Sequence, residues 1–341
     1  MCGKKATEVQ EVCCGDIAAV SKLTDTRTND SLCDPKHPVN LTAIPFPVAN
    51  YTMAIAPKTK GQEDKVANGL VRLSEEDMTF HCVNNAETRQ MVLTGTGDIQ
   101  LSVLCAKLKD RFGVEVTLSP ARVPYREKIR KKVKVEGKHK KQSGGHGQYG
   151  DVWIEFEPCD SEELVFAENV FGGSVPKNFF PAVEKGLRDS VQHGVLAGYP
   201  VVYLKATLVD GSYHPVDSSE MAFKTAASLA YKAGLAQANP VLLEPIGELH
   251  VIVPDSYTGD VMGDLNKRRG RVMGMNPVEA GEQEIVAEVP MGEMGTYAID
   301  LRSMTQGRGM FTYAFLRYED TPPAVQEKAI AEAKQMQGDE E

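Results

Sequence analysis

The chain has 341 residues, of which 42% are hydrophobic, and it carries a formal net charge of −9 at neutral pH. This length predicts two to three domains, and no apolar run approaches the roughly 20 residues that span a bilayer. No hydrophobic signal-peptide core follows the first residues. The seven cysteines form no Cys-x-x-Cys pair, which argues against a disulfide framework or a zinc site and fits a reducing compartment. We therefore expect a cytoplasmic monomer that binds no metal and no membrane.

Residues 1–47 have the pattern of short strands joined by turns, with strands expected at 8–12 and 16–20. They are too few to close a sheet, so we interpret them as the end of a domain whose beginning is absent. Pro45 and Pro47 mark a linker to the next domain.

Two regions, 48–120 and 244–325, are each expected to fold in the order βαββαβ. In the first, the apolar patterns predict strands at 51–56, 78–83, 90–93 and 114–118 and helices at 60–73 and 98–112. In the second, they predict strands at 246–253, 271–275, 284–289 and 310–318 and helices at 257–269 and 293–304. Such units are ferredoxin-like, with two helices on one face of an antiparallel sheet. The fold class is therefore α+β and multidomain.

The region between these units, 121–243, has a different pattern. It predicts a long basic strand, further strands at 152–156 and 201–209, and helices at 182–193 and 217–233. Asp217 and Glu220 fit a capping box at the start of the second helix. Residues 326–341 are expected to form a C-terminal helix and a solvated acidic tail.

A basic stripe runs from Arg126 to Lys141, with nine Lys or Arg residues and two Glu residues. A local positive charge on an acidic protein indicates a partner that is met at one place, and phosphate is the expected ligand. An ordinary solvated strand face explains the same run equally well. Within the stripe, Lys138, Lys140 and Lys141 are the candidate RNA contacts because they lie closest to the glycine-rich segment that follows.

That glycine-rich segment, Gly144–Gly150, has four glycines in seven residues and lies between two strands. Glycines let the backbone approach another chain closely, and the aromatic rings could stack on bases. We therefore predict an RNA-facing tip, with a plain flexible hairpin as the alternative. Its candidate RNA contacts are Gly144, Gly145, His146, Gly147, Gln148 and Tyr149.

His214 lies in a second loop, Gly211–Asp217, between a strand and a helix. No nucleophile or paired acid accompanies it in sequence, so we expect RNA contact and no catalytic residue. An unremarkable loop histidine is the alternative. A predicted helix ends in three basic residues, Lys267, Arg268 and Arg269. These cations could contact phosphate, or they could simply complement the negative end of the helix dipole.

The chain contains no Gly-x-x-x-x-Gly-Lys-Ser/Thr phosphate loop, so it lacks the usual backbone cradle for a nucleotide phosphate. We therefore expect no enzymatic activity and no cofactor in this chain.

Ordered motifs nonetheless resemble those of elongation factor G, a translational GTPase. The resembling segments are 15–20 and 28–34 for its second domain, 56–60 and 95–99 for its third, 136–145, 196–202 and 211–220 for its fourth, and 243–245, 259–270 and 301–309 for its fifth. The resemblance implies a C-terminal fragment without the GTPase domain, which would hold GTP and magnesium in the parent. It also implies a remnant of the second-domain β-barrel at 1–47, followed by domains at 48–120, 121–243 and 244–325. The domain at 121–243 is expected to be a ribosomal-protein-like β-α-β domain.

In this family the fourth domain reaches the decoding centre during movement of tRNA and mRNA. The resemblance therefore implies the ribosome, ribosomal RNA, tRNA and mRNA as partners. His146 and Pro215 depart from the residues that many members carry, which resembles a divergent subgroup. A ribosomal protection or recycling factor, or a stand-alone RNA-binding module without a GTPase, are the alternatives to a translocase.

Overall fold

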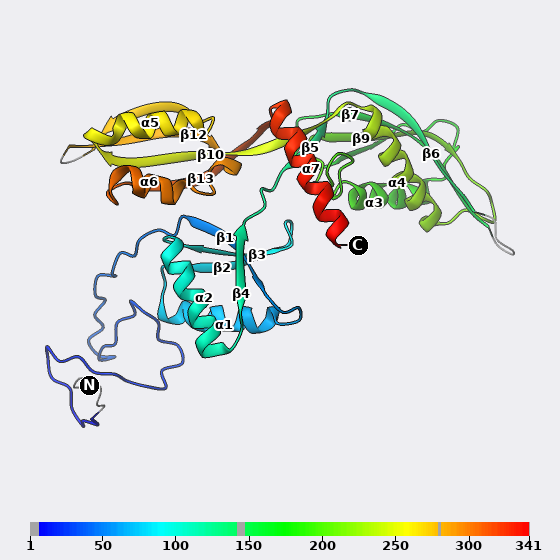
Figure 1. Cartoon of the computed structure of the whole chain (residues 1–341). Helices are drawn as coiled ribbons and strands as arrows, with labels where there is room; N and C mark the ends of the chain where they lie inside the picture. The colour runs from blue at the N-terminus through cyan, green and yellow to red at the C-terminus, as the bar shows by residue number, and fades with distance from the viewer. Residues whose placement is uncertain (1–6, 142–146, 279–280, 341) are drawn as a thin grey trace.

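The computed structural model describes residues 7–141, 147–278 and 281–340, with the backbone alone for the last five of these. This part of the chain forms three sheets, each covered by helices on one face (Figure 1). A mixed α+β architecture with several domains is therefore confirmed. No helix among the described residues combines the length and the hydrophobicity needed to cross a lipid bilayer.

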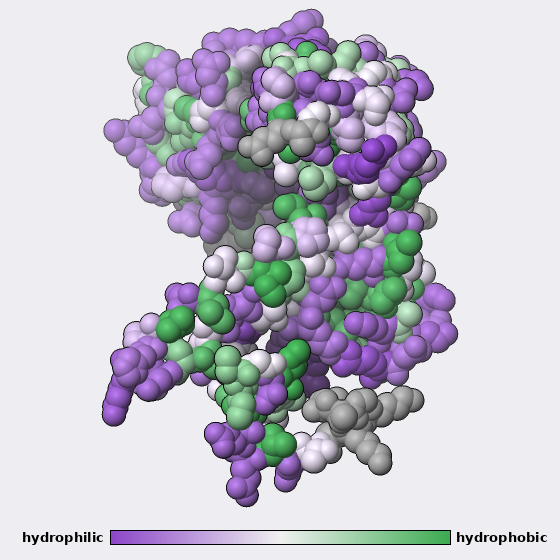
Figure 2. Space-filling view, turned by 90° about the vertical axis from the view of Figure 1, so that its left-hand side faces the viewer, coloured by the Kyte–Doolittle hydropathy of each residue, from purple (hydrophilic) through white to green (hydrophobic). Residues whose placement is uncertain are grey.

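The N-terminal segment 7–50 is extended and forms no helix or strand. The strands expected at 8–12 and 16–20 are therefore wrong. Their apolar side chains lie in solvent, with Val9 64% and Ile17 95% exposed, and no strand among the described residues pairs with them. Figure 2 shows hydrophobic residues interspersed with hydrophilic ones in the lower part of the surface, where this segment lies. Its interpretation as a piece of a β-barrel stays a prediction.

The first βαββαβ unit has the expected order. It comprises β1 (Tyr51–Pro57), α1 (Glu63–Glu76), β2 (His81–Asn85), β3 (Gln90–Gly95), α2 (Asp98–Phe112) and β4 (Val116–Pro120). The strands lie in the order β2-β3-β1-β4 and every pair is antiparallel. Apolar side chains at helical spacing, such as Leu70, Leu101 and Leu104, are buried against the sheet. Helix α2 ends at Gly113, whose φ of 61° allows the left-handed C-cap.

The second βαββαβ unit repeats this arrangement. It comprises β10 (Pro240–Pro254), η2 (Asp255–Tyr257), α5 (Thr258–Lys267), β11 (Arg271–Pro277), β12 (Glu282–Pro290), η4 (Met291–Glu293), α6 (Tyr297–Thr305) and β13 (Met310–Asp320). The strand order β11-β12-β10-β13 is that of the first unit, shifted along the chain. Alternate residues of β10, Leu249, Val251 and Val253, are fully buried beneath the helices.

The middle unit is built around a four-stranded sheet in the order β6-β7-β9-β8. Its elements are β5 (Arg126–Ile129), β6 (Val133–Lys141), β7 (Gln148–Pro158), β8 (Val165–Glu168), η1 (Lys177–Phe179), α3 (Phe180–Ser190), β9 (Leu204–Ser212) and α4 (Glu220–Gln237). Strand β8 pairs in parallel with β9, which makes the segment from β8 through α3 to β9 a β-α-β crossover. Val152, Ile154 and Phe156 of β7 alternate inward and are fully buried.

Helix α4 packs on the hairpin of β6 and β7 at very short range. A Cβ atom on Gly137 would lie 2.1 Å from the Ala226 carbonyl oxygen, and one on Gly150 would lie 2.5 Å from the Ala222 carbonyl oxygen. Glycine is required at both positions because any side chain would push the helix off the strands. This close contact fixes β6 and β7 against the helix, and the described ends of these strands lie at one extremity of the molecule (Figure 1).

Strand β10 also joins the middle unit to the second βαββαβ unit. Its first four residues, 240–243, pair with β5, and its later residues pair with β12 and β13. Helix α7 (Pro323–Glu340) crosses this junction, where Ala329 and Ala333 pack on Leu242 and Ala197 (Figure 1).

Candidate nucleic-acid interface

The two loops singled out in the sequence meet at the end of the middle unit. The Gly147 amide donates to Asp217 Oδ1 at 2.9 Å, and the Tyr149 amide donates to the Asp217 carbonyl oxygen at 2.8 Å. The Ser218 hydroxyl donates to the Tyr149 carbonyl oxygen at 2.9 Å. Backbone and side-chain bonds therefore tie the β6–β7 end to the loop that follows β9. We refer to Gly147–Tyr149 together with Tyr213–Ser218 as the tip.

His214 is exposed at this tip, with 52% of its side chain accessible. Its Nδ1 atom accepts bonds from the Asp217 amide at 3.2 Å and the Val216 amide at 3.4 Å. A neutral ring that accepts through Nδ1 carries its proton on Nε2, so the ring offers a donor to a ligand. The Tyr149 ring lies 6.4 Å away between centroids. Two aromatic rings thus stand next to each other at the tip.

The capping box predicted for Asp217 and Glu220 is wrong. Ser219 is the N-cap of α4, and its hydroxyl accepts from the Ala222 amide at 3.2 Å. A serine at this position satisfies one free amide of the first turn as well as an aspartate would. The Asp217 carboxylate is thereby available to bind Gly147 in the other loop.

Of the glycine-rich segment, Gly144, Gly145 and His146 lie outside the described residues. Gly147 is half-buried against Asp217, and a Cβ there would lie 3.1 Å from the Asp217 carboxyl carbon. The Gln148 side chain is exposed, and its Oε1 atom lies 2.9 Å from His139 Nε2 on the paired strand. Gln148 and Tyr149 are therefore held in the first pairs of the β6–β7 ladder.

The basic stripe is not one uniform surface. Lys138 Nζ lies 3.5 Å from a Glu136 oxygen and 3.6 Å from Asp151 Oδ2, whereas Lys140 and Lys141 are exposed beside the tip. Other cations of the stripe bind carboxylates of the protein, namely Arg126 with Glu87, Lys128 and Arg130 with Asp320, and Lys132 with Glu155 and Glu157. The stripe therefore divides into an end occupied by internal ion pairs and an end at the tip.

The phosphate contact predicted for Lys267, Arg268 and Arg269 stays a prediction, and two of the three side chains form ion pairs within the protein. Arg268 is 12% exposed and binds Asp264 and Asp300, at 2.7 and 2.5 Å. Arg269 forms a two-pronged pair with Glu244 at 2.7 and 2.8 Å and reaches Glu293 at 3.1 Å. Both guanidinium groups are thus used within the fold, where they fasten the end of α5 to neighbouring elements. Lys267, at the end of α5, lies on the second βαββαβ unit and not at the tip.

Sequence reasoning missed Asp151 and Ser212, which lie beneath the tip, and Ser218, which lies within it. Ser212 donates to Asp151 Oδ2 at 2.6 Å, and its Oγ atom lies 2.7 Å from the Tyr149 hydroxyl. No spacing in the sequence marks these residues, because they are brought together only by the pairing of Asp151 with Ser212 across β7 and β9. The register of that pair could not be read from apolar alternation alone.

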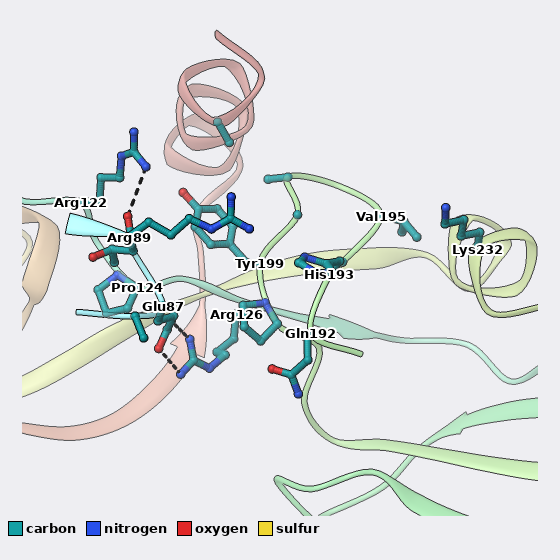
Figure 3. Close-up of a pocket in the computed structure, with 17 residues that line it drawn as sticks. Glu87, Arg89, Arg122, Pro124, Arg126, Gln192, His193, Val195, Tyr199 and Lys232 are labelled. Atoms are coloured by element: carbon teal, nitrogen blue, oxygen red, sulfur yellow. Dashed lines mark hydrogen bonds and ion pairs between the residues drawn. The ribbon is translucent and has the colours of Figure 1, made fainter. Parts of the chain in front are cut away.

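A separate cleft of about 1050 Å³ lies where the first unit, the middle unit and α7 meet (Figure 3). Its charged lining residues are Glu87, Arg89, Arg122, Arg126 and Lys232. Arg126 and Glu87 face each other across it as a two-pronged ion pair (Figure 3). This pair connects β5 to the β2–β3 turn, so the cleft walls come from different units.

Within the described ranges, no cluster of three or more His, Cys, Asp or Glu side chains has the geometry of a metal site. The tip gathers exposed lysines and two aromatic rings, which makes recognition its candidate role. Such groups suit phosphate contact and base stacking.

Family models match three consecutive stretches of the chain. They are elongation factor G domain III over residues 45–120, domain IV over 121–239 and the elongation factor G C-terminus over 241–329. None of these three is the GTPase domain of that family. The tip described above lies within the domain IV match.

Among solved structures, the chain is similar to the crystal structure of ttk003000868 from Thermus thermophilus. The two share 40% sequence identity with a TM-score of 0.77, over 90% of this chain and 46% of that chain. This chain therefore spans about half the length of that relative. The ordered domain matches and the shared fold together show that the chain belongs to the elongation factor G family, of which it comprises domain III, domain IV and the C-terminal domain.

Proposed function

We propose that this chain is the ribosome-binding part of an elongation factor G-like translocase. In the intact factor, domain IV would enter the decoding centre and contact ribosomal RNA, tRNA and mRNA while a GTPase domain supplies GTP hydrolysis with magnesium. The chain itself would contribute recognition and positioning, and no bond chemistry.

The observation that supports this proposal is the tied tip. Gly147 and Tyr149 from one loop are joined to Asp217 and Ser218 from the other by the three hydrogen bonds described above. Within the second loop, the Ser218 amide also donates to the His214 carbonyl oxygen at 3.1 Å. A tip fixed in this way presents His214 and Tyr149 in one arrangement before any ligand arrives. Preorganisation lowers the entropy that binding would otherwise cost.

A paired measurement on His214→Ala tests the proposal. The variant is placed in a full-length factor that contains this region, and single-turnover GTP hydrolysis and mRNA movement are followed on ribosomes. We expect movement to slow by about tenfold and hydrolysis to stay within about twofold, because base stacking is worth roughly 1–3 kcal/mol per base.

His37→Ala, an exposed histidine in the N-terminal segment, serves as the matched control. If hydrolysis falls as much as movement, or if movement is unchanged, His214 does not act at the decoding end. If movement continues but the variant factor no longer displaces a ribosome-bound inhibitor, the protection-factor alternative is favoured instead. Activity of the chain without any GTPase domain would favour the stand-alone RNA-binding module.

A further inference from the structure

A chain of hydrogen bonds runs from the Tyr149 ring into the body of domain IV. The Tyr149 hydroxyl lies 2.7 Å from Ser212 Oγ, and Ser212 Oγ lies 2.6 Å from Asp151 Oδ2. Asp151 and Ser212 are directly opposite each other on β7 and β9. This series of hydrogen bonds therefore begins at an aromatic ring of the tip and ends on the sheet.

The two hydroxyl groups in this series of hydrogen bonds can donate in only one direction, toward Asp151. An ionised carboxylate accepts and cannot donate, so Ser212 must give its single hydroxyl proton to Asp151. Ser212 is then left with lone pairs only, and the Tyr149 hydroxyl must donate to it. This polarity fixes the Tyr149 hydroxyl, and with it the side-chain angle of the ring.

Lys138 contributes to the same arrangement. Its ammonium lies 3.6 Å from Asp151 Oδ2 and 5.9 Å from the centroid of the Tyr149 ring. The Asp151 carboxylate raises the pKa of Lys138, which keeps this cation charged over the ring. A cation above a tyrosine face is attracted by the ring electrons.

Burying the Asp151 carboxylate is energetically unfavourable, which argues against an incidental role for this side chain. Its side chain is only 8% exposed, and Oδ1 has no hydrogen-bond donor among the described residues. Burying a carboxylate oxygen in this way destabilises a fold, and valine or threonine would fill a strand position more favourably. A group that opposes stability beneath the tip points to a role in recognition, because natural folds accept such local costs mainly at functional sites.

We propose that Asp151 is a positioning residue for RNA recognition: through Ser212 it sets the Tyr149 ring as a stacking platform, with Lys138 held on its face. This inference rests on the proposed function, because it presumes that the tip contacts RNA. It adds that the platform is oriented from beneath, by residues that touch no RNA themselves.

The test uses the whole chain and a fluorescein-labelled single-stranded RNA of mixed sequence, with binding followed by fluorescence anisotropy. Ser212→Ala and Tyr149→Phe each break the hydroxyl chain and should weaken binding by about three- to tenfold, within the range of a stacked base. The double variant should bind no worse than either single one, because both remove the same link. Ser212→Thr restores the hydroxyl and should restore binding.

Asp210→Asn is the matched control, since Asp210 lies on the same strand and bonds the Gly211 amide without reaching Tyr149. Thermal unfolding followed through Trp153 confirms that each variant is folded, and Tyr149→Phe remains informative if Ser212→Ala unfolds. If Tyr149→Ala weakens binding while Ser212→Ala and Tyr149→Phe do not, the positioning role is overturned and RNA contact at the tip survives. If Tyr149→Ala has no effect, both this role and the proposed tip contact are overturned.

Discussion

The Asp217 carboxylate binds the Gly147 amide at 2.9 Å, although the two residues are 70 positions apart in the chain. The other carboxylate oxygen lies 3.3 Å from His214 Nδ1. The Asp217 side chain therefore joins its own loop to the other loop of the tip through the Gly147 amide, and a bond to an ionised acceptor is stronger than one between neutral groups.

Replacing Asp217 with alanine should loosen the tip. We expect the free energy of unfolding of domain IV to fall by about 1–3 kcal/mol, the usual loss when a partly buried charged acceptor is removed. Urea denaturation followed by the fluorescence of Trp153, the one tryptophan of the chain, reports this domain. Asp160→Ala, at an exposed aspartate of the same domain, should leave the midpoint unchanged. Equal effects of the two substitutions would show that Asp217 is not a clamp.

Lys140 and Lys141 should carry the salt-dependent part of RNA affinity. Each phosphate contact adds roughly 0.7–0.9 to the slope of log affinity against log salt. Substituting both residues with glutamine should therefore flatten that slope by about 1.4–1.8 for the chain titrated with ribosomes. Lys132→Gln is the control, because Lys132 binds Glu155 and Glu157 at 2.8 and 3.2 Å. If Lys132→Gln flattens the slope as much, the binding surface is the whole basic stripe and not its end at the tip.

Arg126 should couple three parts of the molecule. It binds Glu87 of domain III, lies 5.1 Å above the Tyr318 ring of the C-terminal domain, and belongs to β5. Arg126→Ala should increase the radius of gyration measured by solution X-ray scattering, since the domains lose a partly buried pair. Arg111→Ala removes a comparable pair with Glu76 inside domain III and should leave the scattering unchanged. An identical profile for both variants would mean that other contacts set the domain arrangement.

The C-terminal domain should lose stability as the pH rises from about 6.5 through the raised pKa of His250. Its hydrogen bond to Glu284 raises the pKa of His250 above 6.5, and Glu248 acts in the same sense. A raised folded pKa means that the stabilisation is complete below about pH 6.5 and is lost as the pH rises through the folded value. His250 in turn lowers the pKa of Glu284, whose contribution disappears only in acid, below about pH 4.5.

Calorimetric unfolding of the chain at about pH 6 and about pH 8 measures this difference. His250→Gln should reduce it, whereas His81→Gln, at an exposed histidine of domain III, should not. An unchanged pH dependence in His250→Gln would assign the effect to other groups.

Local patterns predicted most of the elements but not the contacts between them. Helix Asp98–Phe112 begins and ends where the sequence places it, since an apolar stripe and the following Gly113 mark its face and its end. Strand β8, Val165–Glu168, was missed because four residues are too short for a periodic pattern. Strand β8 pairs in parallel with β9 only because the intervening helix α3 packs on the sheet and brings the two strands together. Such a tertiary contact leaves no local pattern in the sequence.

The candidate site was predicted in outline only. Glycine and histidine marked the two loops, and both lie at one end of domain IV. Arg268 and Arg269 show the limit of charge counting, since carboxylates from distant elements bind them. Sequence could not reveal those partners, because Glu244 and Asp300 are brought near only by the folded sheet and helices.

Strand β10 has a mechanical consequence. Its residues 240–243 pair with β5 and its residues 243–254 pair with β12 and β13, so one unbroken strand serves two domains. A flexible linker would let the two domains rotate independently. A strand shared by both sheets instead couples the rotation of one domain to the other. Rotating the C-terminal domain about β10 would twist the β5 pairing and so displace the distant tip, which makes the strand a lever between domain IV and the C-terminal domain.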